Sequence, residues 1–105
     1  MPQSVTQCPV EQAIQVIGGR WKLLVLRSLL LNGPQRYNEL LGTVTAISAK
    51  ELTRNLRELV NATLVTREPS RVGRYGLTEL GKGLMPAFTE LLRWGARLLT
   101  HIPVR

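Results

Sequence analysis

The spacing of apolar positions along the chain predicts helices over most of its length. Val10–Ile17 gathers its apolar residues on one face, and Gly18-Gly19 ends this first helix. Trp21–Leu31 is apolar almost all round, which predicts a central, buried helix that stops at Asn32-Gly33-Pro34. The segment 35–37 is too short to assign, and a brief strand is one interpretation of it.

A short helix and then a well-marked one follow. We expect Asn38 to cap the short helix and Gly42 to end it. Ser48 and Glu51 have the spacing of a capping box, and Ile47 and Leu52 have that of a hydrophobic staple. The sequence therefore predicts that a helix begins at Ser48. Its leucines 52, 56 and 59 form an inward stripe, opposite a basic and polar outward face.

The last third of the chain predicts a hairpin and a long helix. Leu64–Glu68 and Arg71–Leu77 are typical of two strands joined by a short connection at Pro69-Ser70. Thr78 is a credible N-cap for a helix that runs to about residue 99, and Pro86 should kink or split it. We therefore expect one domain over residues 1–105, mainly α with a small β-hairpin. The order is that of a winged helix-turn-helix with an extra helix at each end.

Composition and charge narrow the function. The 14 lysines and arginines outnumber the 7 acidic residues and give a net charge of +7, which favours a polyanionic partner over a merely basic soluble protein. With Cys8 and His101 as single copies and no aspartate, we expect no metal, no cofactor and no enzymatic activity. The apolar runs are too short for a membrane span and no signal peptide is apparent, so we expect a cytoplasmic protein with no membrane partner.

Two helices joined by a tight turn, the second with basic and small polar residues outward, are typical of helices that enter the major groove of double-stranded DNA. A hairpin with a cluster of arginines can lie along the phosphate backbone or enter the minor groove. The alternative to DNA binding is that the polar helix face is only solvated and that the arginines of the hairpin serve only solubility. The candidate DNA-binding residues are Arg36, Ser48, Ala49, Lys50, Thr53, Arg54, Arg57, Arg71 and Arg74.

The last helix has an apolar face nearly twice as wide as one core requires. A second copy of the chain is the simplest cover for the surplus, which predicts a homodimer. The alternative is that the N-terminal helix of the same chain covers it. The candidate interface residues are Val10, Ile14, Ile17, Leu84, Phe88, Leu91, Leu92, Trp94 and Leu98.

Several segments resemble the HxlR-type transcriptional regulators. They are Cys8-Pro9-Val10-Glu11, Ile17-Gly18-Gly19-Arg20-Trp21, Arg36-Tyr37-Asn38-Glu39-Leu40, Leu56-Arg57-Glu58-Leu59 and Leu77-Thr78-Glu79-Leu80-Gly81. The resemblance implies a homodimeric winged-helix protein that binds an inverted repeat, dimerises through its N- and C-terminal helices and acts as a repressor. Where the family often has a glycine after the DNA-reading helix, this chain has Ala62-Thr63, so we expect Asn61 to adopt the left-handed conformation.

The resemblance also implies that Cys8 senses a small electrophile or an oxidant. A helix N-terminus favours the reactive thiolate, whereas Glu11 one turn further on opposes it. The alternative is an inert cysteine packed in the dimer interface. For the whole chain, the alternative to DNA binding is a winged-helix module that binds another protein.

Overall fold

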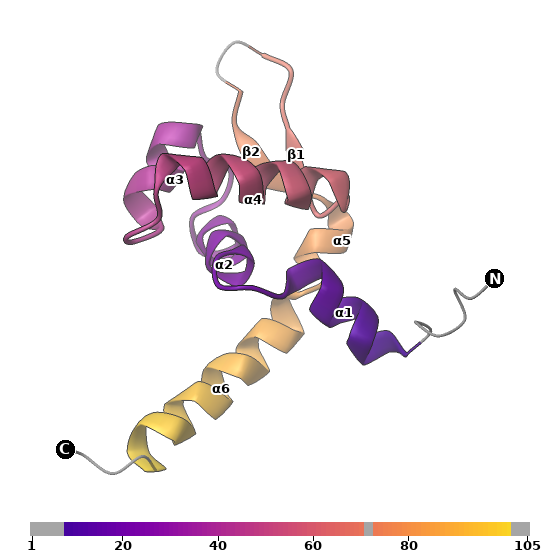
Figure 1. Cartoon of the computed structure of the whole chain (residues 1–105), viewed down its shortest axis with the longest axis vertical. Coiled ribbons are helices and arrows are strands. Elements are labelled where there is room, and N and C mark those ends of the chain that lie inside the picture. Colours follow the sequence, from indigo (N-terminus) through magenta and orange to yellow (C-terminus); the bar gives the residue numbers. More distant parts are fainter. Residues whose placement is uncertain (1–7, 71–72, 102–105) are drawn as a thin grey trace.

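The computed structural model describes residues 8–70 and 73–101 and contains the helices and the hairpin in the predicted order (Figure 1). The elements are α1 (Pro9–Ile17), α2 (Lys22–Asn32), α3 (Tyr37–Thr43), α4 (Ala49–Asn61), β1 (Val65–Arg67), β2 (Tyr75–Leu77), α5 (Glu79–Lys82) and α6 (Met85–His101). The prediction of a mainly α fold with a small antiparallel hairpin is confirmed. No helix within the described ranges is long and apolar enough to cross a membrane.

Helix α2 forms the centre of the core. Figure 1 looks nearly along its axis, with α3 and α4 beside it. Val25, Leu26 and Leu29 are buried on α2, as its nearly continuous apolar surface predicts. The predicted inward stripe of α4 is buried against them, together with Leu40, Leu64 and Val65. The unit formed by α2, α3, α4 and the hairpin therefore has a complete core of its own.

A buried polar cluster joins the root of the hairpin to α2 and α3. The Gln35 side-chain amide donates to the Ser28 carbonyl at 3.1 Å and to Ser28 Oγ at 2.9 Å, and it accepts from Thr43 Oγ1 at 2.9 Å. The Gln35 backbone pairs with that of Tyr75 through N–O distances of 2.9 and 2.7 Å. The brief strand suggested for residues 35–37 is therefore a single bridge, and it fixes β2 to the helices.

Both ends of α3 and the turn after α4 differ from the prediction. Helix α3 begins at Tyr37, because the Glu39 carboxylate accepts the Arg36 N–H at 2.8 Å, and it ends at Thr43. The prediction of Asn38 as the N-cap and of Gly42 as the last residue was wrong. After α4 the left-handed residue is Thr63, with φ +63°, and Asn61 stays helical.

The end of α4 has a physical reason. The Thr63 N–H donates to the Val60 carbonyl at 3.0 Å and the Leu64 N–H to the Leu59 carbonyl at 3.0 Å, which is a Schellman arrangement. Leu64 is buried, so the turn is placed where it brings this side chain into the core. That requirement puts the left-handed conformation on a threonine, despite its cost for a β-branched residue.

The hairpin is shorter in its strands and longer in its connection than predicted. Register pairs Val65 with Leu77 and Arg67 with Tyr75. The predicted start of the second strand at Arg71 lies outside the described residues, but Gly73, at φ +63°, cannot continue a strand. The Glu68 N–H donates to the Arg74 carbonyl at 2.8 Å and closes the connection.

Pro86 divides the last helix. Of the two predicted outcomes, a split is observed, with α5 and α6 separated at Gly83 and Leu84. Pro86 has no N–H to donate to the carbonyl of residue 82, so it stands in the first turn of a new helix. Figure 1 shows α6 projecting from the body on the side away from the hairpin, and none of the residues Met85–His101 is buried.

Candidate nucleic-acid interface

The start of α4 is fixed by its own sequence. Ser48 Oγ accepts the Glu51 N–H at 3.1 Å, and the Glu51 carboxylate accepts the Ser48 N–H at 3.5 Å. Ile47 and Leu52, the predicted staple, are both buried. The predicted capping box is confirmed, and it leaves the first turn of α4 rigid and facing solvent.

Side chains on the outward face of α4 are exposed to solvent. The small residues at its start and the polar row behind them are all exposed: Ser48, Ala49, Lys50, Thr53, Arg54 and Arg57. Arg36, at the start of α3, and Arg74, in the hairpin, are exposed as well, whereas Arg71 lies outside the described residues. The structure thus groups the described candidate residues on α3, α4 and the hairpin, which adjoin one another (Figure 1).

Tyr37 joins the two helices of the helix-turn-helix. Its hydroxyl donates to the Ala49 carbonyl at 2.8 Å and lies 2.8 Å from Thr53 Oγ1. Since a phenol has one hydrogen, Thr53 is the donor in the second contact. Tyr37 is not among the candidate residues chosen from the sequence, because its partners are 12 and 16 residues away in the chain.

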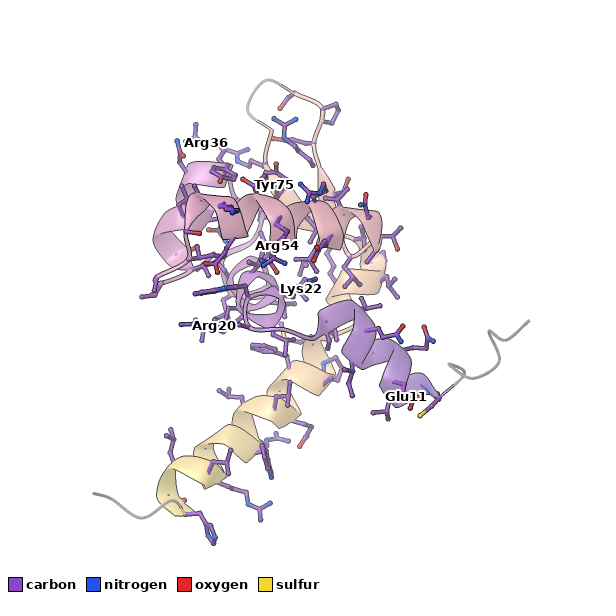
Figure 2. All side chains as sticks on the ribbon, viewed as in Figure 1. Glu11, Arg20, Lys22, Arg36, Arg54 and Tyr75 are labelled. Atoms are coloured by element: carbon purple, nitrogen blue, oxygen red, sulfur yellow. The ribbon has the colours of Figure 1, made fainter. Side chains whose placement is uncertain are left out.

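Two cations, Lys22 of α2 and Arg54 of α4, flank Glu58 on the side of α4 that faces α2. Lys22 Nζ lies 2.5 Å from Glu58 Oε1, and Arg54 Nη1 lies 3.8 Å from the same oxygen. The hydrogen bond from Lys22 lowers the pKa of Glu58 below its usual value, against the opposing effect of desolvation, and the charges of Lys22, Arg54 and Arg57 lower it further. Figure 2 shows Arg54 on the side of α4 toward Lys22, with Tyr75 on the side toward the hairpin. The Lys22–Glu58 pair ties α4 to α2.

The apolar faces of α1 and α6 are uncovered in the single chain. Val10 and Ile14 on α1 are 64 % and 61 % exposed, and Leu92 and Trp94 on α6 are 69 % and 56 % exposed. Leu91 and Leu98 are also exposed, whereas Ile17, Leu84 and Phe88 are half-buried in their own subunit. The alternative that α1 of the same chain covers α6 is wrong, because both faces remain open.

Helix α1 begins at Pro9, one residue before the predicted start, so Cys8 is its N-cap residue, and the Cys8 side chain is exposed in the single chain. Its carbonyl accepts the Gln12 N–H at 3.0 Å, but its thiol makes no capping hydrogen bond. Within the described ranges, no group of three or more side chains could hold a metal ion. The arrangement therefore offers a reachable thiol, a basic helix face and two open apolar faces.

Similarity to known proteins identifies the family. Residues 16–103 match the model of the HxlR-like helix-turn-helix family. The HTH-type transcriptional regulator YkvN of Bacillus subtilis is 44 % identical over 93 residues, which cover 84 % of this chain and 77 % of that protein.

Two solved structures have the same fold. Quinone-bound YodB from B. subtilis superposes with a TM-score of 0.76 at 35 % identity, over 86 % of this chain and 99 % of the other. The redox regulator HypR in its oxidised form superposes with a TM-score of 0.78 at 34 % identity, over 92 % of this chain and 100 % of the other. The winged helix-turn-helix prediction is thereby confirmed.

Proposed function

Because this chain belongs to the HxlR-like helix-turn-helix family and is a transcriptional regulator of that type, we propose that it binds a specific inverted-repeat DNA sequence as a homodimer and represses transcription. The observation that carries the proposal is the rigid, exposed start of α4 with its row of basic and small polar side chains. One α-helix fits the major groove, and small residues at its N-terminal end let the backbone approach the bases closely. Family members are regulators, so no catalytic activity is proposed.

The roles of the α4 side chains follow from their positions. Lys50 is assigned to a phosphate, and Arg54 and Arg57, near the helix centre, to bases or phosphates. Arg54 must exchange its 3.8 Å contact with Glu58 for the DNA contact. If Arg54 reads a guanine, replacing it by alanine should weaken the free energy of DNA binding by about 1–3 kcal/mol, on the cognate site alone. An equal loss on cognate and random DNA would assign it to a phosphate.

The homodimer is supported by the open faces of α1 and α6. Large side chains exposed along both helices would be covered by the same helices of a second copy, in a twofold arrangement. Two α4 helices would then reach successive major grooves, with half-sites about one helical turn, or a multiple of one, apart.

We also propose that Cys8 makes the regulator responsive to electrophiles or oxidants. The relatives supply the chemical class: YodB is known with a bound quinone, and HypR in oxidised and reduced forms. The exposed thiol at the start of α1 lies next to the proposed dimer interface, so its modification could alter the pairing of subunits. Cys8→Ser should leave DNA affinity intact and abolish any response to diamide or a quinone. A response that persists in the variant would disprove the role, since the chain has one cysteine.

The decisive experiment is selection of bound sequences from random DNA, followed by anisotropy titrations at two salt concentrations. DNA binding predicts that log affinity falls steeply and linearly with log salt, because bound phosphates release counterions. The competing function, a winged-helix module that binds another protein, predicts no enriched DNA sequence and a partner whose binding changes little with salt. The selected half-sites and their spacing would also test the homodimer.

A further inference from the structure

A groove runs between α4 and the root of the hairpin. Arg57 and Thr53 line it from α4, Arg67 and Tyr75 from the two strands, and Tyr37 from α3. Arg67 is not among the candidate DNA-binding residues chosen from the sequence, although it belongs to the hairpin's arginine cluster. Two arginines from different elements thus face one depression on the DNA-reading side of the molecule.

The position of Arg67 is set by its neighbours. Its guanidinium carbon lies 5.8 Å from the centre of the Tyr75 ring, within cation–π range, on the paired residue of the opposite strand. The guanidinium also lies against Gly73, where an added Cβ would stand 2.4 Å from Arg67 Nη2. The ring and the bare glycine together hold the guanidinium across the hairpin.

Neither arginine of the groove is neutralised in the single chain. Among the residues that the structure describes, Arg57 and Arg67 have no carboxylate within 4.0 Å, whereas Arg54 and Arg36 pair with Glu58 and Glu39. The hydroxyls of Tyr37 and Thr53 also line the groove, but Tyr37 already donates its hydrogen to the Ala49 carbonyl and Thr53 donates its own to Tyr37, so the donors for a ligand come from the two arginines. Two uncompensated guanidinium groups at one groove form a site for an anion.

We propose that this groove binds a backbone phosphate of the DNA strand that separates the major from the minor groove, held by Arg57 and Arg67. The inference rests on the proposed function, and it follows from topology. If α4 occupies the major groove and the hairpin reaches toward the adjacent minor groove, the strand between the two grooves must pass between α4 and the hairpin. Phosphate contacts at this place fix the register of α4 without reading sequence. Tyr75 and Gly73 act as positioning residues for Arg67.

The test compares Arg57→Ala, Arg67→Ala and a control that loses the same charge elsewhere, Arg93→Ala. Arg93 is exposed on α6, away from the groove, and pairs with Glu90. Each groove variant should bind about tenfold more weakly, because a charge-assisted hydrogen bond is lost. The loss should be equal on cognate and random DNA, and the slope of log affinity against log salt should fall by about 0.9. The control should match the parent.

Three outcomes overturn the inference. Groove variants that match Arg93→Ala in affinity and slope, while the parent binds with a steep salt dependence, would show that no phosphate sits there. A loss confined to the cognate site would show that the arginines read bases. A parent that binds no DNA, or binds it independently of salt, would refute the proposed function itself, which is a different result.

A second variant tests the positioning role. Gly73→Ala should displace the Arg67 guanidinium and weaken binding, because its Cβ would occupy the guanidinium's place. In the double variant with Arg67→Ala, the glycine substitution should then add nothing, since the two residues act through one contact. Additive losses would show that Gly73 acts independently of Arg67. Circular-dichroism melting of each variant checks that the subunit stays folded, above all for Gly73→Ala, because Gly73 is buried and has a φ of +63°.

Discussion

Replacing Leu92 on α6 by alanine tests whether the open apolar face joins two subunits. Leu92 is 69 % exposed in the single chain, so it contributes little to the fold of its own subunit. In a twofold interface the same substitution is made on both sides of the contact. The variant should therefore weaken dimerisation while leaving the monomer folded.

The magnitude follows from the exposed fraction. Fully burying a leucine side chain contributes about 1.5–3 kcal/mol, so covering the fraction of Leu92 that is exposed contributes about 1–2 kcal/mol per subunit. The pair of subunits then loses about 2–4 kcal/mol. Since about 1.4 kcal/mol is a factor of ten, the dimer dissociation constant should rise roughly 30- to 700-fold.

Sedimentation velocity over a series of protein concentrations measures this constant. The parent should sediment with twice the mass of the 11.7 kDa chain, and Leu92→Ala should dissociate at much higher concentrations than the parent does. Arg93→Ala, next to it on the polar side of α6, is the matched control and should behave as the parent does. A rise of less than about threefold for Leu92→Ala would refute the assignment of this face, since such a change corresponds to well under 1 kcal/mol. A parent that stays monomeric would refute the dimer.

The remaining predictions concern stability, and each is read from chemical or thermal unfolding. Ser48→Ala should lower the free energy of unfolding by about 1 kcal/mol, because it removes the cap of α4. An unchanged midpoint of unfolding would argue against the cap. Glu58 has a lowered pKa in the folded state. Its contribution to the stability of the fold is therefore fully present above its ordinary pKa of about 4.5, and it is lost as the pH falls through the pKa of the folded state. The parent should lose more stability than Glu58→Gln between pH 5 and pH 3; equal losses would contradict the ion pair. Gly81→Ala should destabilise by about 1–3 kcal/mol or more, because its Cβ would stand 2.3 Å from the Leu64 carbonyl oxygen. Gly95→Ala, where a Cβ meets nothing within 4 Å, should stabilise the isolated subunit by about 0.5–1 kcal/mol, and a loss in the monomer would contradict the open space there.

Features of the fold that depend on neighbouring residues were predictable. The start of α4 requires only Ser48, Glu51 and the staple, all within six residues of one another, and the structure confirms them. The split at Pro86 follows in the same way from the missing N–H. The start of α3 is also predictable from the sequence, because Glu39 stands three residues after Arg36. The prediction was wrong because Asn38 is the more common type of cap residue.

Features that depend on packing were not predictable from local patterns. Thr63 is left-handed because Leu64 must enter the core, which no rule on the residues after α4 reveals. In the candidate site, the outward row of α4 followed from helical periodicity. The contacts of Tyr37 with Ala49 and of Lys22 with Glu58 join distant parts of the chain, so they emerge only when the helices are packed.

Helix α6 is attached to the unit formed by α2, α3, α4 and the hairpin, but it takes no part in the core of that unit. Its 17 residues make a rod about 25 Å long. In a dimer joined through this rod, its length and crossing angle determine how far apart the two α4 helices stand. Each added turn would move the subunits by about 5.4 Å without disturbing a buried residue. Operator spacing could therefore evolve through insertions in α6, independently of operator sequence, which would change through substitutions on α4.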